Sequence, residues 1–188
     1  FFPKILEGPI VQYHDFVMPN RQNMLISDMV ISSIQKFIIG LGKKVIIADS
    51  LGEIVDQIFA VGYMGADIWI AWLGAIGYSL QLYFDFSGYS DMAIALGHIF
   101  GFNFFENFNY PYISKSITEF WRRWHISLGS WFKNYLYIPL GGNRKGNCRT
   151  YINLTIVFFV TGVWHGVGWT FIFWGMLHGI CIIFEKMF

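Results

Sequence analysis

The chain has 188 residues, of which 55% are hydrophobic, 20% aromatic and only 13% charged. This composition is too apolar for an ordinary soluble domain and indicates a membrane protein. A net charge of +1 without a dense basic run argues against nucleic acid as a partner.

The first part of the chain, Phe1 to Asn23, is interrupted by three prolines. We expect an interfacial loop or a broken helix there, with His14 on its surface. The segment lacks the basic start, apolar core and cleavage site of a signal peptide. Because the chain does not start with methionine, we expect it to be an excerpt from a longer polytopic protein.

Two apolar stretches that follow are predicted to be membrane helices. Ser27 to about Ala48 is apolar but carries lysines, including Lys43 and Lys44 near its end, which would reach the lipid headgroups. Ile68 to Phe84 is uncharged and just long enough to cross a bilayer. A third apolar helix, Phe86 to Gly101, is expected after Asp85.

That third helix carries two polar residues, Asp91 and His98. Asp85 and Asp91 are candidates for a polar network or proton path, but we favour helix capping and pairing with a buried arginine such as Arg122 or Arg123. For His98 the preferred interpretation is a packed core residue without a functional role.

An irregular link from Phe102 to Tyr112 leads to a predicted helix from Ile117 to about Tyr137. Ser116 and Glu119 have the spacing of a capping box at its start. At about 100° per residue, His125 falls in the apolar sector and faces the interior, whereas the charged side chains lie opposite. Such a helix suits the lining of an internal cavity or an interfacial position.

The loop from Leu140 to Thr150 is rich in glycine and basic residues. Short basic loops stay in the cytoplasm, so we expect this loop on the same side as Lys43 and Lys44. Its charge is consistent either with binding of a CoA or carrier-protein phosphate or with ordinary topology, and the sequence leaves both open.

The run from Thr150 to Phe184 contains no Asp, Glu, Lys or Arg. As one helix it would be roughly 50 Å long against roughly 30 Å of bilayer core, so two segments are predicted. Gly162, Gly166 and Gly168 mark the break. His165 lies at this break, and an ionisable group deep in a membrane is a functional hypothesis by default.

Neither the spacing of the histidines nor any sequence motif predicts a metal site or a nucleotide-binding site. His165 and His178 are out of phase for one helix face, and no HExxH, GxGxxG, P-loop or GxSxG pattern is present. Cys148 and Cys181 form no CxxC pair, and we assign neither to a disulfide or a metal. His178 is interpreted as a packed core residue.

The remaining hypothesis is that a histidine in an apolar setting transfers a proton. Burial disfavours a charged imidazolium, so a deep histidine stays neutral and able to accept a proton. Beside a hydroxyl acceptor and an activated acyl donor, such a base would catalyse acyl transfer. Trp164 and Trp169 would exclude competing water, whereas the aromatic stripes at 120–136 and 169–174 are attributed to packing.

Several motifs in the same order resemble the membrane-bound O-acyltransferase family over nearly the whole chain. They are Tyr-Phe-Asp-Phe-Ser-Gly-Tyr-Ser-Asp-Met at 83–92, Asn-Tyr-Pro-Tyr at 109–112, Phe-Trp-Arg-Arg-Trp-His-Ile-Ser-Leu at 120–128, Tyr-Ile-Pro-Leu-Gly-Gly-Asn-Arg at 137–144 and Val-Trp-His-Gly at 163–166. The resemblance implies that His165 is catalytic and that His125 is a second active-site group.

It also implies an all-α, polytopic membrane fold in which broken and interfacial helices surround a tunnel. Residues 1–188 would form a single partial membrane domain whose flanking helices are missing. An acyl thioester, acetyl-CoA or an acyl carrier, would arrive from the cytoplasm as co-substrate, without a bound cofactor or metal. The acceptor would be a hydroxyl of an exported or cell-surface polysaccharide such as alginate.

The implied location is the inner membrane, as a multi-pass protein in contact with the lipid bilayer, the polysaccharide and periplasmic or extracellular acetylation partner proteins. Two alternatives stay open. One is D-alanyl transfer to teichoic acid within the same family, and the other is a transporter that relays protons through buried His and Asp residues.

Overall fold

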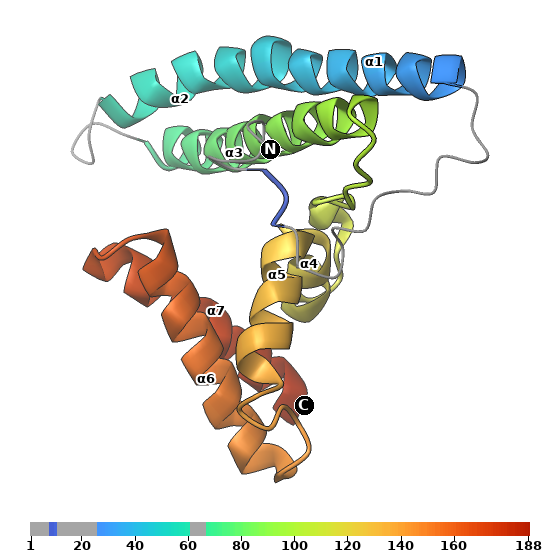
Figure 1. The fold of residues 1–188 in the computed structure, drawn as a ribbon. Coiled ribbons are helices and arrows are strands. Elements are labelled where there is room, and N and C mark those ends of the chain that lie inside the picture. Colours follow the sequence, from blue (N-terminus) through green and yellow to red (C-terminus); the bar gives the residue numbers. More distant parts are fainter. Residues whose placement is uncertain (1–7, 11–25, 61–66) are drawn as a thin grey trace. The chain divides into compact units, whose positions relative to one another are not determined.

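The computed structural model describes residues 8–10, 26–60 and 67–188, and every element assigned in those residues is a helix (Figure 1). The predicted all-α class is confirmed for this part of the chain. The expectations for Phe1 to Asn23, with His14, fall almost entirely outside the described residues. The chain divides into two compact units, residues 1–106 and 107–188, which are described separately.

The first unit is a pair of long helical stretches. α1 (Ile26–Gly42), a π-helical turn (Lys43–Ala48) and α2 (Asp49–Ala60) follow one another without a break. This run lies along α3 (Ile68–Ile99), as Figure 1 shows. The carboxylate of Asp67 caps α3 by accepting a hydrogen bond from the Ile68 amide at 2.6 Å.

Two glycines let these helices approach closely. A Cβ added at Gly40 would lie 2.7 Å from the Gly88 carbonyl oxygen, and one added at Gly88 would lie 2.7 Å from the Gly40 oxygen. Only hydrogen fits at either position, so the two backbones are in near contact. Small residues at helix crossings serve this purpose in membrane proteins.

The sequence predicted two helices separated at Asp85, but α3 is a single helix through that residue. The charge does not end the helix because Lys44, from the π-helical turn, places its Nζ 2.6 Å from an Asp85 carboxylate oxygen. The same ammonium lies 2.8 Å from Asp49.

Asp91 is paired in the same way, and the predicted partners Arg122 and Arg123 are wrong. The Lys43 Nζ donates to Asp91 at 2.7 Å, and Lys36 lies 3.4 Å from the other carboxylate oxygen. Asp91 faces α1 across the helix interface, and the lysines of α1 and the following turn therefore lie nearest. Arg123 instead pairs with Glu119, four residues earlier, at 2.8 Å.

The second unit begins within the predicted irregular link, at residue 107, and contains one short turn and five helical elements. They are a 3₁₀ turn (Pro111–Ile113), α4 (Ile117–Arg123), α5 (Ile126–Phe132), a π-helical segment (Lys133–Tyr137), α6 (Gly146–His165) and α7 (Trp169–Met187).

The capping box at the start of α4 is confirmed, because the Ser116 hydroxyl accepts from the Glu119 amide at 3.0 Å. The Glu119 carboxylate accepts from the Lys115 amide at 2.9 Å. Glu185, near the end of α7, accepts from the amides of Ile117 and Thr118. Thus α7 supplies part of the cap that a short helix needs.

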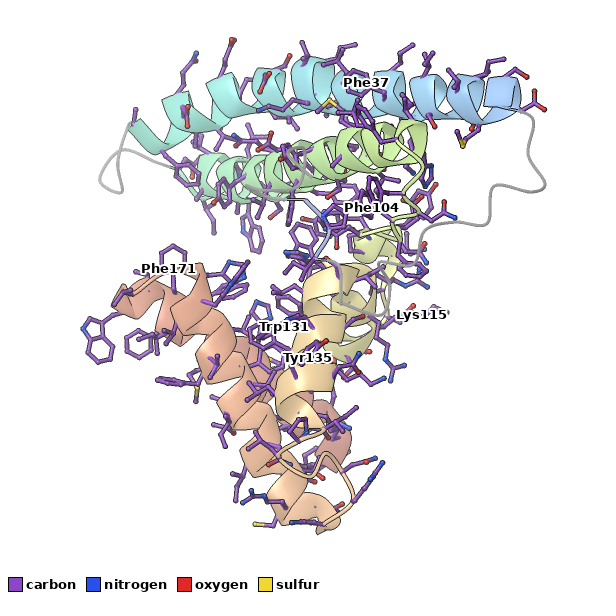
Figure 2. All side chains as sticks on the ribbon, viewed as in Figure 1. Phe37, Phe104, Lys115, Trp131, Tyr135 and Phe171 are labelled. Carbon is purple, nitrogen blue, oxygen red and sulfur yellow. The ribbon has the colours of Figure 1, made fainter. Side chains whose placement is uncertain are left out.

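The predicted continuous helix from Ile117 to Tyr137 is wrong, since the backbone leaves the helical region at Trp124 (ψ 128°) and His125 (φ 45°). A new helix starts at Ile126. The helical-wheel argument that placed His125 in the interior assumed an unbroken helix. The side chain is buried instead because the chain turns at this residue, between α4 and α5. Trp131 and Tyr135, labelled in Figure 2, follow the break with ring centroids 5.5 Å apart.

The uncharged C-terminal run folds as two helices that meet at residues 166–168, which confirms the prediction. A Cβ at Gly162 would lie 2.7 Å from the Phe171 carbonyl oxygen, and one at Gly175 would lie 3.1 Å from the Gly162 Cα. Phe171, labelled in Figure 2, also fills the space beside Gly166. Glycine thus sets the spacing of this hairpin.

Within the described residues, α7 is the helix whose length and apolar composition suit a membrane crossing. Its aromatic stripe was predicted to pack within the protein, but Trp169 is 74% exposed and Phe173 69% exposed. The stripe at 120–136 is better packed, with Phe120 and Trp124 stacked at 5.6 Å.

Candidate active site

His125 lies at the break between α4 and α5 and is 5% exposed. Its φ of 45° and ψ of 55° place it in the left-handed region, which a residue with a Cβ occupies at a cost of about 1–2 kcal/mol. The turn aims the side chain inward from the corner between two short helices. Backbone strain of this kind persists where surrounding contacts hold it and is common at functional sites.

Asn107 holds this corner through its side chain and its backbone. Its Oδ1 lies 3.2 Å from the His125 Nδ1 and accepts from the Ser127 amide at 3.1 Å and the Ser127 hydroxyl at 2.9 Å. Its carbonyl oxygen accepts from the Ile126 amide at 2.9 Å. Asn107 itself is 1% exposed.

The environment of His125 disfavours a positive charge. Burial, and to a lesser extent the nearby His165, lower the pKa of its imidazole to about 4. At neutral pH His125 is therefore an uncharged imidazole, with one nitrogen as donor and the other as acceptor.

The indole ring of Trp164 lies between His125 and His165. The His125 and Trp164 centroids are 6.4 Å apart, and the Trp164 and His165 centroids are 4.8 Å apart. On its other side His165 meets Trp174 at 4.9 Å in an edge-to-face arrangement. The two predicted site histidines, 40 positions apart in sequence, thus belong to one aromatic cluster.

His178 belongs to the same cluster, with centroids 5.1 Å from both Trp174 and Trp121. Its half-buried position between two indoles agrees with the packing role predicted for it. Trp164 lies beside both site histidines, but it is 54% exposed, and His165, predicted to lie deep in the protein, is exposed as well. Trp169, predicted with Trp164 to exclude water, is largely exposed and its ring lies against Phe173.

A cavity of about 430 Å³ opens between α4, α5 and the α6–α7 hairpin. Its wall includes His125 and apolar side chains such as Trp121 and Phe158. His165 is not among its lining residues and is exposed at the end of α6. Three cationic side chains also line it: Arg122, Lys133 and Lys186.

In the described part of the chain, no three His, Cys, Asp or Glu side chains are grouped so that they could hold a metal ion. Cys148 is exposed, Cys181 is half-buried, and both are free thiols.

Sequence reasoning missed Asn107 and Ser127. The link from Phe102 to Tyr112 was predicted only as irregular backbone, and Ser127 fell inside the predicted continuous helix without a role of its own. The available signal was the polar content of that link immediately before a helix that carries a buried histidine.

The membrane-bound O-acyltransferase family profile matches residues 1–188. A protein of Azotobacter vinelandii named probable alginate O-acetylase is 51% identical over 185 residues, which cover 98% of this chain and 37% of that protein.

A peptidoglycan O-acetyltransferase of Helicobacter pylori is 46% identical over 192 residues, covering 100% of this chain and 36% of that protein. A teichoic acid D-alanyltransferase of Bacillus subtilis is 34% identical over 206 residues, covering 99% and 50%. The chain therefore spans little more than a third of the length of the first two relatives.

Proposed function

The chain belongs to the membrane-bound O-acyltransferase family, and on that premise we propose that its protein transfers an acetyl group from a thioester to hydroxyls of an exported or cell-surface polysaccharide. Relatives named for O-acetylation of alginate and of peptidoglycan, each about half identical to this chain, support the acetyl group and the polymer acceptor. The observation that carries the proposal is the aromatic cluster that joins His125 and His165.

In this proposal a neutral His165 is the general base. It takes the proton of an acceptor hydroxyl while the hydroxyl oxygen attacks the thioester carbonyl carbon. The new C–O bond forms, the C–S bond breaks, and the thiol leaves with the proton that the imidazolium returns. The rings of Trp164 and Trp174 flank His165, and in the full-length protein they would help to exclude water that would otherwise accept the acetyl group.

The cavity beside His125 is the proposed donor site. Its apolar wall suits the uncharged arm of a thioester, and Arg122, Lys133 and Lys186 suit the phosphate of acetyl-CoA or of an acyl carrier. His125 would contact the donor as a second active-site group. No bound cofactor is required for this chemistry.

The proposed setting is the inner membrane, in a multi-pass protein that surrounds a tunnel open to the cytoplasmic donor and the external acceptor. Acetylation partner proteins on the outer side would deliver or receive the polymer. The family and the apolar helix α7 support a membrane location.

D-alanyl transfer to teichoic acid is the main alternative, favoured by the 34% identity to the Bacillus subtilis enzyme. A proton relay through Asp85 and Asp91 has less support, because both carboxylates are engaged by lysines of the first unit. Mass analysis of the polymer modified in cells distinguishes an acetyl from a D-alanyl ester.

The test is His165→Ala in the full-length protein, assayed for transfer of labelled acetyl from a thioester to polymer. We expect transfer to fall by about 10²–10⁴-fold, the contribution of a general base. His178→Phe is the matched control, since phenylalanine keeps the ring between Trp121 and Trp174 and should retain transfer. Intact transfer by His165→Ala with normal yield and melting temperature would remove His165 from the mechanism.

A further inference from the structure

We propose that Asn107 is a positioning residue that fixes the tautomer of His125, with the proton on Nδ1 and the lone pair on Nε2. The inference rests on the proposed function, because it concerns how the second active-site histidine is prepared. It assigns a role to a residue outside the motifs that carry the family resemblance.

The contacts of Ser127 identify which side-chain atom of Asn107, the amide oxygen or the amide nitrogen, faces His125. The Ser127 backbone N–H can only donate, and it points at the Asn107 atom 3.1 Å away. That atom must therefore be the amide oxygen, which agrees with the Ser127 hydroxyl donating to it at 2.9 Å.

The state of His125 follows from that oxygen. An amide oxygen has no proton to give, so the His125 Nδ1 at 3.2 Å must be the donor. A neutral imidazole carries one N–H, which leaves the lone pair on Nε2. Side chains that fix a histidine tautomer in this way are a recurrent device for making the opposite nitrogen basic.

The backbone contacts make this arrangement rigid. The Asn107 carbonyl accepts from Ile126 at 2.9 Å, and the Asn109 amide donates to the Arg123 carbonyl at 2.9 Å. The link therefore holds the chain on both sides of the left-handed residue His125. Glycine or asparagine would adopt that backbone at lower cost, so a histidine there indicates that its side chain is needed.

Two substitutions of Asn107 distinguish a residue that fixes the His125 tautomer from one that only holds the backbone in place. Replacing the amide by a carboxylate, Asn107→Asp, keeps an acceptor for all three donors. It also adds a negative charge beside Nδ1, which raises the pKa of His125. Asn107→Leu removes this acceptor and leaves Nδ1 with the more distant Ser127 hydroxyl, 3.5 Å away, so the Nδ1–H tautomer would lose its stabilisation and the Nε2–H tautomer would become favoured.

The experiment uses the full-length enzyme with ¹⁵N-labelled histidine, and His125→Asn identifies the His125 signals. The wild type and Ser127→Ala should show a protonated Nδ1 and an unprotonated Nε2. Asn107→Leu should reverse this pattern and lower kcat by about 10²-fold or more, with a smaller change in KM. Asn107→Asp should keep the pattern and move the acidic limb of the kcat–pH profile to higher pH.

The exposed Asn103 provides the matched control, since Asn103→Leu should change neither the spectrum nor the pH profile. A wild-type signal with the proton on Nε2 would overturn the inference whatever the activity, and so would an unmoved acidic limb in Asn107→Asp. Full turnover by His125→Asn would instead show that His125 has no part in the reaction, which overturns the role proposed for that residue while His165 is tested separately.

Discussion

Acidification should destabilise the folded protein through His125. In the unfolded chain its imidazole takes up a proton near its ordinary pKa of 6.5, whereas burial keeps the folded group neutral down to about pH 4. Between these values the unfolded state binds the extra proton, so stability is full above about pH 6.5 and falls as the pH drops towards about 4.

The size of this effect follows from the same two pKa values. Each pH unit in that window removes about 1.4 kcal/mol, so the whole pKa displacement from 6.5 to about 4 corresponds to about 3 kcal/mol. Below about pH 4 both states carry the proton and His125 contributes no further change.

The assay is chemical unfolding of the full-length protein in detergent, followed by tryptophan fluorescence from about pH 7 to about pH 4. His125→Asn is the matched variant, because its amide N–H can still donate to Asn107 and asparagine tolerates the left-handed backbone. All other titratable groups are unchanged, so the difference between the two pH profiles isolates His125. Parallel profiles would refute the claim that the folded state holds this imidazole neutral.

Three further outcomes are expected. Gly175→Val should lower stability by about 1–3 kcal/mol, because any Cβ there meets the α6 backbone. Gly42 is helical with open space around it, so Gly42→Ala should keep or raise stability, by up to about 1 kcal/mol, in the same thermal melt. Asp91→Asn should cost about 1–3 kcal/mol, because the half-buried Lys43 loses its carboxylate partner, while Lys36 keeps Glu106. Replacing the exposed Asp49 by Asn should cost under about 1 kcal/mol, and equal losses in the two variants would contradict this. Arg122→Gln should raise the KM for acetyl-CoA more than for a phosphate-free acetyl thioester, and an equal change for both would place the phosphate elsewhere.

Local patterns in the sequence predicted the elements that depend on neighbours in the chain. The capping box at Ser116 and the break after His165 both arise from residues within a turn or two of each other. The apolar pattern also predicted the C-terminal hairpin correctly. Where such patterns failed, a distant side chain decided the outcome: Lys44 allows α3 to pass through Asp85, and Asn107 holds the corner that interrupts the helix at His125.

The sequence by itself determined that this chain is helical and apolar, because composition and periodicity reflect which side chains can leave water. The motifs that resemble the family singled out His125 and His165 as candidate catalytic residues. Only the tertiary structure decided which charges pair and how the two histidines meet through Trp164. Those contacts join residues tens of positions apart, and no spacing in the sequence encodes the geometry by which Asn107 directs a proton to one nitrogen of a ring.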